Sequence, residues 1–469
     1  MNALNGQQIN SLIKSCVDEK ALNSIIVNFN MNAKTKPREI NKMLLLNEKF
    51  KKLFGEVFTP IPLVEEMLDK LPKEVWKDKN LKWVDPSCGT CNFLLVIKER
   101  LMESLIDIID DKEEREKWIL EQMLYGVDIQ ERNVVLSKLR LDPYNKYKLH
   151  IEAHDSLSFD FWRLNPDRVI IVGNPPYNDE KNKSNNTVSI YPLFVEKAIG
   201  LTNKFVLMIT PSRWFFATSH NDHRKKMIYN YGLKHLTHFE NHKFFGGTDI
   251  KGGLSYFVCQ KGYNGECEFS YNGQTSNRNF KKSGHIFLDI RNENIAEKVV
   301  DKINKSNLKL SSAMYVRNGH INTNDQRLTE DDSGIPCFAS KNRKLYVQKN
   351  NIDLNAVNYG KYKAINQLAQ GVGQDIISDF IFCDKSEIAN SSFIAFPFDT
   401  EKETRNFINY MSLKPVKFLV ALRKSTQAIT STCFDYVPVL WEEIQSDKDY
   451  YEYFDLSKKE IELIEEFVK

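Results

Sequence analysis

From about residue 55 to residue 262 short apolar segments alternate with helical ones, and this alternation constrains the fold more than any other feature. We predict strands at residues 81–84, 124–127, 149–153, 169–172, 205–209 and 254–259, with helices between them, such as residues 92–108 and 191–200. Such alternation is typical of a mostly parallel sheet with helices on both faces. Ligands of these sheets bind beyond the carboxyl ends of the strands, so residues that follow a strand are candidate site residues.

The fourth predicted strand ends in a glycine and then in Asn174, Pro175, Pro176 and Tyr177. Two successive prolines fix the backbone and donate no hydrogen bonds, while their carbonyls still accept. The Asn174 side chain adds an acceptor, and the Tyr177 ring is a flat stacking surface. Two acceptors and a ring suit a planar group with an exocyclic amine, such as adenine. A plain turn is the alternative, because Asn-Pro is a common turn pair.

Acidic residues follow the first three predicted strands. Asp85 opens a loop that contains Ser87 and Gly89 and leads into a helix, which is the layout of a nucleotide site. Asp128 is placed to accept from ribose hydroxyls, and Asp155 from an adenine amine. A helix cap would explain either of these two aspartates alone. Caps explain acids at three consecutive strand ends poorly.

Cys88 and Cys91, in the first of these loops, have the spacing of a redox motif or of half a zinc site. The sequence has no second pair of that kind to complete a metal site. The flanking Asp85 and Gly89 suit a cofactor turn better, so we favour that interpretation.

Two further segments flank the predicted sheet. Thr59 and Pro60 precede a helix that begins near Pro62, and free amides at such a helix start can hold a carboxylate. Phe245 precedes the last predicted strand. Its ring is either a core residue or a stacking surface.

Length and composition favour a soluble multidomain protein. A chain of 469 residues fits two or three domains. No run of 18 apolar residues occurs, so we expect no membrane span. The eight cysteines are scattered over a long chain, which favours reduced thiols and a cytoplasmic protein. The net charge is +3, and the last 28 residues alone carry ten acids and four lysines. The basic remainder is compatible with nucleic acid but signals it weakly.

We expect three regions along the chain. Residues 1–50 are a helical N-terminal extension, residues 51–262 a catalytic domain, and residues 263–469 a second domain with irregular short strands. The boundary follows from the polar, Gly- and Asn-containing stretch 262–283. The chain ends in a helix from residue 457, with a capping box formed by Ser457 and Glu460.

These motifs, in this order, resemble N6-adenine DNA methyltransferases of restriction-modification systems, and most of all the Eco57I-like modification methylases. Residues 55–60 look like the motif that opens the cofactor site, and residues 85–92 like the Asp-Pro-x-x-Gly-x-Gly cofactor loop. Residues 174–177 match the catalytic tetrad, residues 210–214 follow the next strand, and residues 249–253 resemble the last catalytic motif. Cys91 replaces the second loop glycine. If that position needs a positive φ, cysteine strains it by roughly 1–3 kcal/mol.

The resemblance implies a Rossmann-like α/β fold dependent on S-adenosyl-L-methionine, followed by an α+β target-recognition domain. In the family's pattern the cofactor's methionine end meets the Thr59–Pro60 segment and the Asp85 loop with Ser87 and Gly89. Asp128 would hold the ribose, and Ile129 would pack on the cofactor's adenine. Asp155 would accept from the adenine amine.

The resemblance also implies the reaction. An adenine flipped out of duplex DNA would stack on Tyr177 and Phe245, while Asn174 and the Pro175 carbonyl accept the two amine hydrogens. No metal is needed. The second domain would choose the DNA sequence, with seven basic candidates for phosphate or base contact: Lys341, Arg343, Lys344, Lys361, Lys363, Arg423 and Lys424.

Three alternatives stay open. A methyltransferase of RNA or of a protein glutamine is one, because the tetrad fits other planar amines. A second is a DNA-specificity subunit that has lost catalysis. A third is a fusion with a nuclease, although the sequence lacks a Pro-Asp…Glu-x-Lys signature. The main interpretation leaves room for a separate cognate restriction endonuclease as a partner.

Overall fold

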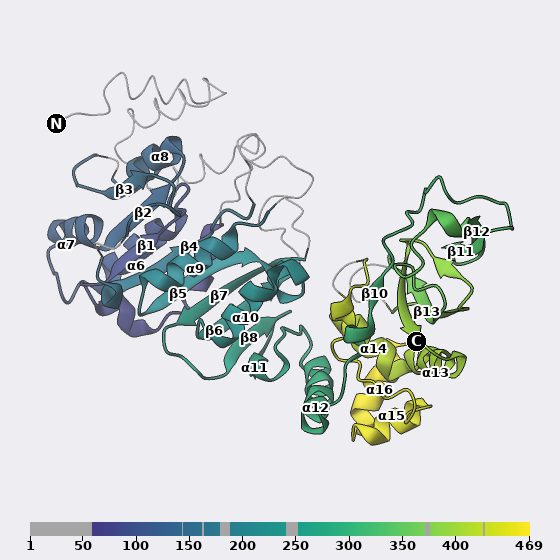
Figure 1. Cartoon of the computed structure of the whole chain (residues 1–469). Coiled ribbons are helices and arrows are strands. Elements are labelled where there is room, and N and C mark those ends of the chain that lie inside the picture. Colours follow the sequence, from purple (N-terminus) through teal and green to yellow (C-terminus); the bar gives the residue numbers. More distant parts are fainter. Residues whose placement is uncertain are drawn as a thin grey trace. The chain divides into compact units, whose positions relative to one another are not determined.

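The computed structural model of the chain describes residues 59–142, 144–161, 164–178, 188–240, 252–370, 376–424 and 427–469. The expected N-terminal extension, residues 1–50, lies outside these ranges. The chain divides into two compact units (Figure 1). The first unit ends at Phe280 and the second begins at Lys281, apart from a short segment, Phe215–Asn221, that groups with the second.

A nine-stranded sheet forms the centre of the first unit (Figure 1). Its order is β3-β2-β1-β4-β5-β7-β6-β8-β9. The strands are β1 (Lys82–Asp85), β2 (Leu124–Asp128), β3 (His150–Ala153), β4 (Val169–Gly173), β5 (Phe205–Pro211), β6 (Leu233–Phe239), β7 (Leu254–Gln260), β8 (Cys267–Tyr271) and β9 (Gln274–Arg278). β1 to β5 are parallel, and β7 is antiparallel to both neighbours. The predicted mostly parallel α/β fold is confirmed.

The chain reverses direction across the sheet between β1 and β4. It passes from β1 outward to β3, and then returns to the other side of β1 with β4. In open α/β sheets, ligands bind at such a switch point, outside the carboxyl ends of the strands. β4 is buried along its whole length, as its apolar sequence requires for a central parallel strand.

Helices cover the sheet and supply the rest of the core. Those of the first unit are α5 (Ile61–Leu68), α6 (Asn92–Ser104), α7 (Lys112–Trp118), α8 (Glu131–Leu141), α9 (Tyr191–Leu201) and α10 (Asn221–Tyr229). The short α11 (Phe280–Ser283) begins at the last residue of the first unit and continues into the second. α6 shows why they form. Phe93, Leu94, Ile97 and Leu101 recur at helical spacing and are all buried in the core.

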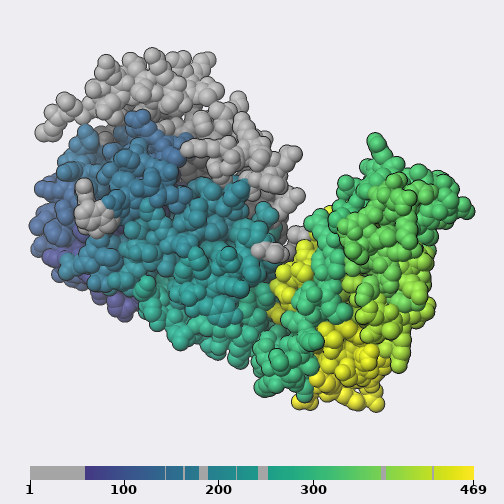
Figure 2. Space-filling view, viewed as in Figure 1, coloured from purple at the N-terminus to yellow at the C-terminus, as the bar shows by residue number. Residues whose placement is uncertain are grey.

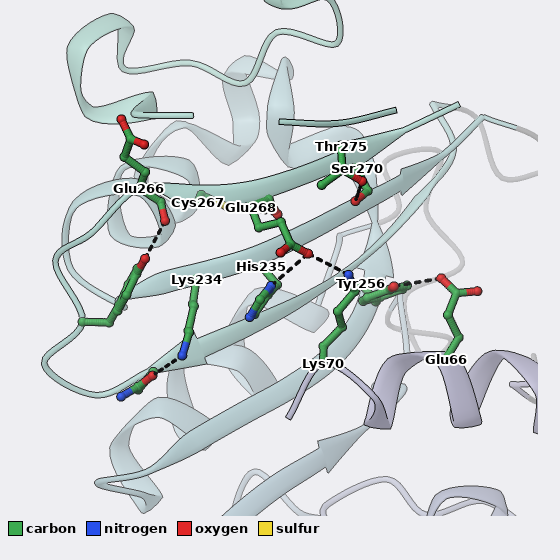
Figure 3. Close-up of polar contacts among 12 residues, drawn as sticks. Glu66, Lys70, Lys234, His235, Tyr256, Glu266, Cys267, Glu268, Ser270 and Thr275 are labelled. Atoms are coloured by element: carbon green, nitrogen blue, oxygen red, sulfur yellow. Dashed lines mark hydrogen bonds and ion pairs between the residues drawn. The ribbon is translucent and has the colours of Figure 1, made fainter. Parts of the chain in front are cut away.

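Polar contacts tie the end of α5 to the antiparallel half of the sheet (Figure 3). Lys70 Nζ lies 2.7 Å from Glu268 Oε1 on β8, and His235 Nδ1 on β6 lies 3.3 Å from the same oxygen. Tyr256 on β7 donates a hydrogen bond of 2.8 Å to Glu66 Oε1. These contacts fix α5, and therefore the segment that precedes it, against the sheet.

The described residues of the second unit form two small sheets and five α-helices. The four-stranded sheet has, in spatial order, β10 (Val316–Arg317), β16 (Phe393–Phe398), β13 (Tyr362–Gln367) and β14 (Ile381–Cys383). The three-stranded sheet has, in spatial order, β12 (Arg343–Val347), β11 (Ile335–Ser340) and β15 (Ile388–Ala389). The helices are α12 (Ile290–Ser306), α13 (Glu401–Ser412), α14 (Lys414–Arg423), α15 (Asp447–Tyr453) and α16 (Lys458–Phe467). The predicted α+β character is observed.

Aromatic rings build the core of the second unit. The Phe396 ring lies 4.7 Å from that of Phe407 and 5.0 Å from that of Phe434. α16 has the predicted capping box of Ser457 and Glu460. Figure 2 shows the green middle segment and the yellow C-terminal helices gathered on different parts of this unit's surface.

The division between the units lies later than the expected boundary at residue 262. The polar stretch 262–283 contains β8 and β9, which extend the first sheet as a hairpin. Asn272 and Gly273 both have positive φ, 48° and 74°, as the two-residue turn of a hairpin requires. Polar residues suit this hairpin because it forms the edge of the sheet. Among the described residues, no helix combines the length and the apolar character needed to cross a membrane.

Candidate cofactor and catalytic site

The loops that follow β1, β2 and β4 lie side by side, because β1 pairs with both of the other strands. Asp85 is in register with Gly126 of β2, and Val84 with Ile171 of β4. The loop after β3 joins them: His154 N donates to the Asp128 carbonyl at 3.0 Å, and Ser156 Oγ donates to the Pro86 carbonyl. The acids predicted at three strand ends therefore lie at one edge of the sheet.

Asp85 is buried at the centre of this edge. A Cβ on Gly173 would lie 2.6 Å from Asp85 Oδ1, so the absence of a side chain on Gly173 makes room for the carboxyl group. Ser87 N donates to the same oxygen at 3.0 Å. Burial, with a smaller contribution from Asp128, raises the pKa of Asp85 to about 8. The carboxyl group can therefore change its protonation state near neutral pH.

The cofactor loop uses two left-handed residues. Gly89 has φ 51° and donates from its N–H to Asp128 Oδ2 at 2.9 Å. Cys91 has φ 65° and ψ 32° at the start of α6, and its side chain is fully buried. Cys91 therefore has the positive φ that strains a residue with a side chain. A hydrogen bond to Cys91 and burial raise the pKa of Cys88, which favours its thiol form.

Sequence reasoning missed a polar face of α8 that supports this loop. Its members lie one turn apart: Asn133, Ser137 and Arg140. Asn133 Nδ2 donates to Asp128 Oδ1 at 3.2 Å, Ser137 Oγ donates to the Gly89 carbonyl at 2.9 Å, and Arg140 donates to the Thr90 carbonyl. All three are buried, and burial lowers the pKa of Arg140 to about 10. The signal was available, because polar residues at i, i+4 and i+7 share one helix face.

The other predicted cofactor residues have different surroundings. Asp128 is nearly buried, and both of its oxygens accept from the protein, since Gln130 N also donates to Oδ1 at 2.8 Å. Asp155 is exposed, and one oxygen accepts from Leu157 N at 2.9 Å, as in a turn cap. Ile129 is 62% exposed. An exposed isoleucine at the ligand edge of a sheet offers a flat apolar surface.

The segment before α5 meets the cofactor loop through Thr59. Asn92 Nδ2 donates to the Thr59 carbonyl at 2.7 Å, while Thr59 Oγ1 is buried and has no hydrogen-bond partner among the described residues. A buried hydroxyl without a partner is costly, and a ligand atom would satisfy it. Pro60 caps α5, and its carbonyl accepts from the N–H groups of two residues of the first turn. The helix start therefore offers fewer free amides than expected.

The tetrad lies directly beside the cofactor loop. Ser87 Oγ donates to the Asn174 carbonyl at 3.1 Å. Pro175 is buried, and no described residue donates to its carbonyl. Tyr177 packs against the core, and burial raises its pKa. Pro176 is exposed.

Backbone contacts close the segment that follows the tetrad. Ile190 N donates to the Tyr177 carbonyl at 3.1 Å, and Asn178 forms an antiparallel bridge with Ser189. The long polar loop between them falls largely outside the described residues. Phe245, predicted to stack on the target base, and residues 249–251 of the last motif also lie outside them.

The structure separates the seven basic candidates of the second unit. Lys363, Arg423 and Lys424 are buried, which corrects the expectation that they contact DNA. Lys363 Nζ donates to the carbonyls of Asn358 and Lys361, at 3.0 and 2.6 Å. Arg423 pairs with Asp435 at 3.3 Å. Buried cations need partners inside the protein, and these two have them.

The four remaining candidates are Lys341, Arg343, Lys344 and Lys361, and all are exposed. Lys361 pairs with Asp399, Arg343 with Glu330 and Lys344 with Glu387. Within the described ranges, no group of three or more His, Cys, Asp or Glu side chains could hold a metal ion.

Known proteins that are similar to this chain include methylases of restriction-modification systems. Residues 122–245 match the model of the Eco57I restriction-modification methylase family. An uncharacterized adenine-specific methylase of Mycoplasma pneumoniae is 26% identical over 318 residues, which cover 50% of this chain and 75% of the relative. The type II methyltransferase M.VspI of a Vibrio species is 26% identical over 180 residues, which cover 38% of this chain and 39% of that protein.

Two solved structures share the fold at 12% identity. One is a nuclease-deletion mutant of the type ISP restriction-modification enzyme LlaGI with a DNA substrate mimic, at a TM-score of 0.52, covering 91% of this chain and 51% of that chain. The other is a DrdV–DNA complex, at a TM-score of 0.51, covering 92% and 61%. The chain thus spans about half to three fifths of those proteins. Residues 122–245 are thus similar to the Eco57I restriction-modification methylase family, in agreement with the motif order.

Proposed function

We propose that this chain is a sequence-specific DNA methyltransferase that transfers a methyl group from S-adenosyl-L-methionine to the N6 amine of adenine. The observation that carries the proposal is the junction of the cofactor loop and the tetrad. Ser87 links the two: its N–H donates to Asp85 Oδ1, and its hydroxyl donates to the Asn174 carbonyl. The donor site and the acceptor site therefore share one rigid edge. The names of the relatives support the same enzyme class.

The residues at this edge fit the proposed cofactor. Ile129 offers an apolar face for an adenine ring, and the second oxygen of Asp155 is available for its amine. Asp128 would hold the ribose by exchanging one of its loop hydrogen bonds. The Thr59 hydroxyl and the loop at Gly89, where no side chain blocks approach, would meet the methionine end.

Bound S-adenosyl-L-methionine supplies an electrophilic methyl group. The chain's own contribution is to hold the amine in line with it. The Asn174 side chain and the Pro175 carbonyl would each accept a hydrogen bond from the amine, which frees the nitrogen lone pair to attack the methyl carbon. The N–C bond would form as the methyl–sulfur bond breaks, leaving S-adenosylhomocysteine, and the nitrogen would give up one proton to water. The backbone that carries both acceptors is held before substrate binds, because Pro175 is buried and the Asn174 main-chain carbonyl accepts from Ser87 Oγ. Fixed dipoles and alignment then provide most of the rate gain.

Duplex DNA hides the adenine amine, so the base must be extruded at a cost of a few kcal/mol. The Tyr177 ring, with Phe245, would stack on it, worth roughly 1–3 kcal/mol per base. The second unit would choose the sequence, with Lys341, Arg343 and Lys344 as its exposed cations. Such an enzyme would act in the cytoplasm beside a separate cognate restriction endonuclease.

The test offers labelled S-adenosyl-L-methionine with three substrates in parallel: plasmid DNA, total RNA and a protein extract. Label in DNA alone supports the proposal. Label in RNA or protein alone would indicate that the enzyme methylates a planar amine of that substrate and not adenine in DNA. Cofactor binding without any transfer would favour a specificity subunit. Degradation of unmethylated plasmid with magnesium would reveal a nuclease activity instead.

A further inference from the structure

The β11–β12 hairpin of the second unit joins its strands by a turn of two residues, Lys341 and Asn342 (Figure 1). Ser340 is paired with Arg343 across this turn, and the pairing shifts between Phe338 and Ser340. Exposure is greatest at the tip of the hairpin. Ile335 and Val347, at the base, are buried, whereas all residues from 340 to 344 are exposed. The tip is therefore free to meet a partner.

The base of the hairpin is held firmly. β11 also pairs with β15, so it is the central strand of its sheet. Thr329 and Tyr346 exchange two backbone hydrogen bonds, at 2.9 and 2.8 Å. Ile335, Cys337 and Val347 pack in one buried cluster. A tip on a firmly anchored ribbon can present side chains with a defined spacing.

Charge is concentrated at this tip. Residues 333–352 contain four basic residues and no acid. Lys344 is anchored, because its Nζ lies 2.6 Å from Glu387 and 4.4 Å from the centre of the Phe338 ring. Arg343 pairs with Glu330, but these side chains are 63% and 72% exposed, and such surface pairs exchange partners at little cost. Lys341 has no ion pair or hydrogen bond with any residue in the described part of the chain.

The tip thus displays a lysine, an asparagine and an arginine in succession. The major groove of DNA, about 12 Å wide, admits a two-stranded β-ribbon. Arginine pairs with the O6 and N7 atoms of guanine, asparagine with the N6 and N7 atoms of adenine, and lysine is a common phosphate contact. The exposed side chains at the tip are the types that read base edges, and they stand on a ribbon of suitable shape.

We propose that the β11–β12 tip enters the major groove and determines part of the recognised sequence. Arg343 reads a guanine and Asn342 an adenine, while Lys341 contacts a phosphate. Lys344 stays with Glu387 and supports the ribbon. This proposal rests on the proposed function for its DNA partner, but it concerns which residues read the sequence and not the methyl transfer.

The experiment selects, from a randomised DNA pool, the duplexes that the chain binds. S-adenosylhomocysteine, which has no methyl group to transfer, is present so that binding is measured without methylation. The full chain is compared with Asn342→Ala, Arg343→Ala, Lys341→Ala and the control Lys458→Ala. The control removes the same charge from α16, where the Lys458 side chain is 91% exposed. Thermal unfolding confirms that each variant is folded.

We expect the wild-type chain and Lys458→Ala to enrich the same motif. Arg343→Ala and Asn342→Ala should each lose preference at one position of it, by about 5- to 150-fold for a discrimination of about 1–3 kcal/mol. Lys341→Ala should keep the motif, bind all sequences more weakly and lower the salt slope by about 1. An unchanged motif in both Arg343→Ala and Asn342→Ala would overturn the proposal, as would a wild-type chain that enriches no motif. Methyl transfer is measured in a separate assay. Failure of the sequence-reading proposal can therefore be told apart from failure of the proposed function.

Discussion

Cys91 gives a direct test of how the cofactor loop is built. It occupies a left-handed conformation, φ 65° and ψ 32°, at the start of α6, and its side chain is fully buried. The relevant variants are Cys91→Gly and Cys91→Ala. Both remove the buried sulfur, so the loss of packing is similar in the two. They differ in their tolerance of positive φ.

The expected difference follows from two opposing effects. A left-handed conformation costs an L-residue roughly 1–2 kcal/mol, which glycine avoids. Glycine also makes the unfolded chain more flexible, which costs about 0.4–1 kcal/mol relative to alanine. The free energy of unfolding of Cys91→Gly should therefore exceed that of Cys91→Ala by about 0.5–1 kcal/mol. Against the wild-type chain, Cys91→Ala should be clearly less stable, because it keeps the strain and loses the sulfur.

Urea denaturation of the full chain, followed by tryptophan fluorescence, measures the difference. Trp83 is fully buried on β1 and reports on the first unit. The matched control is Ala198→Gly in α9, a buried position in a right-handed helix, which should be destabilised by about 1 kcal/mol. If Cys91→Gly proved no more stable than Cys91→Ala, the argument from backbone strain would be wrong.

Three further predictions concern the site. The pKa of Asp85, about 8, lies above its ordinary value of 3.8, so the folded chain binds a proton that the unfolded chain releases between these pH values. The free energy of unfolding should fall with rising pH in this window, by up to about 1.4 kcal/mol per pH unit. The Asp85→Asn variant should not show this fall in the free energy of unfolding. Identical pH dependences of the urea midpoint in the wild-type chain and the variant would contradict the prediction. Asn174→Ala should abolish methyl transfer while calorimetry shows near-normal cofactor binding; full activity would refute its role as amine acceptor. Ile129→Ser should weaken cofactor binding about fivefold, for a loss of about 1 kcal/mol of apolar contact, and unchanged affinity would count against that contact.

The strands of the parallel half could be predicted closely because their sequences are continuous apolar runs. The predicted segments 169–172 and 124–127 correspond to β4 and β2, each extended by one residue. β6 could not be found in this way, since Lys234, His235 and His238 interrupt its apolar residues. The β8–β9 hairpin lies at the sheet edge, where polar residues are tolerated. Only its Asn-Gly turn signalled it.

The site could be predicted from strand ends, because strand order brings the loops after β1, β2 and β4 together. The hydrogen-bond partners could not. Asp128 accepts from Gly89 N of the loop after β1, and this contact depends on a turn conformation that residue type does not specify. The sequence also did not predict which charged side chains are buried. Lys363 and Arg423 resemble surface cations until tertiary contacts supply their partners.

The central claim is that the edge formed by the cofactor loop and the tetrad methylates adenine in DNA. The most direct measurement incubates the chain with S-adenosyl-L-methionine bearing a labelled methyl group and mixed-sequence duplex DNA, then separates the product nucleosides, with Asn174→Ala in parallel. The account predicts label only in N6-methyladenine, and none from the variant. Label in another nucleoside, or equal N6-methyladenine from Asn174→Ala, would contradict it.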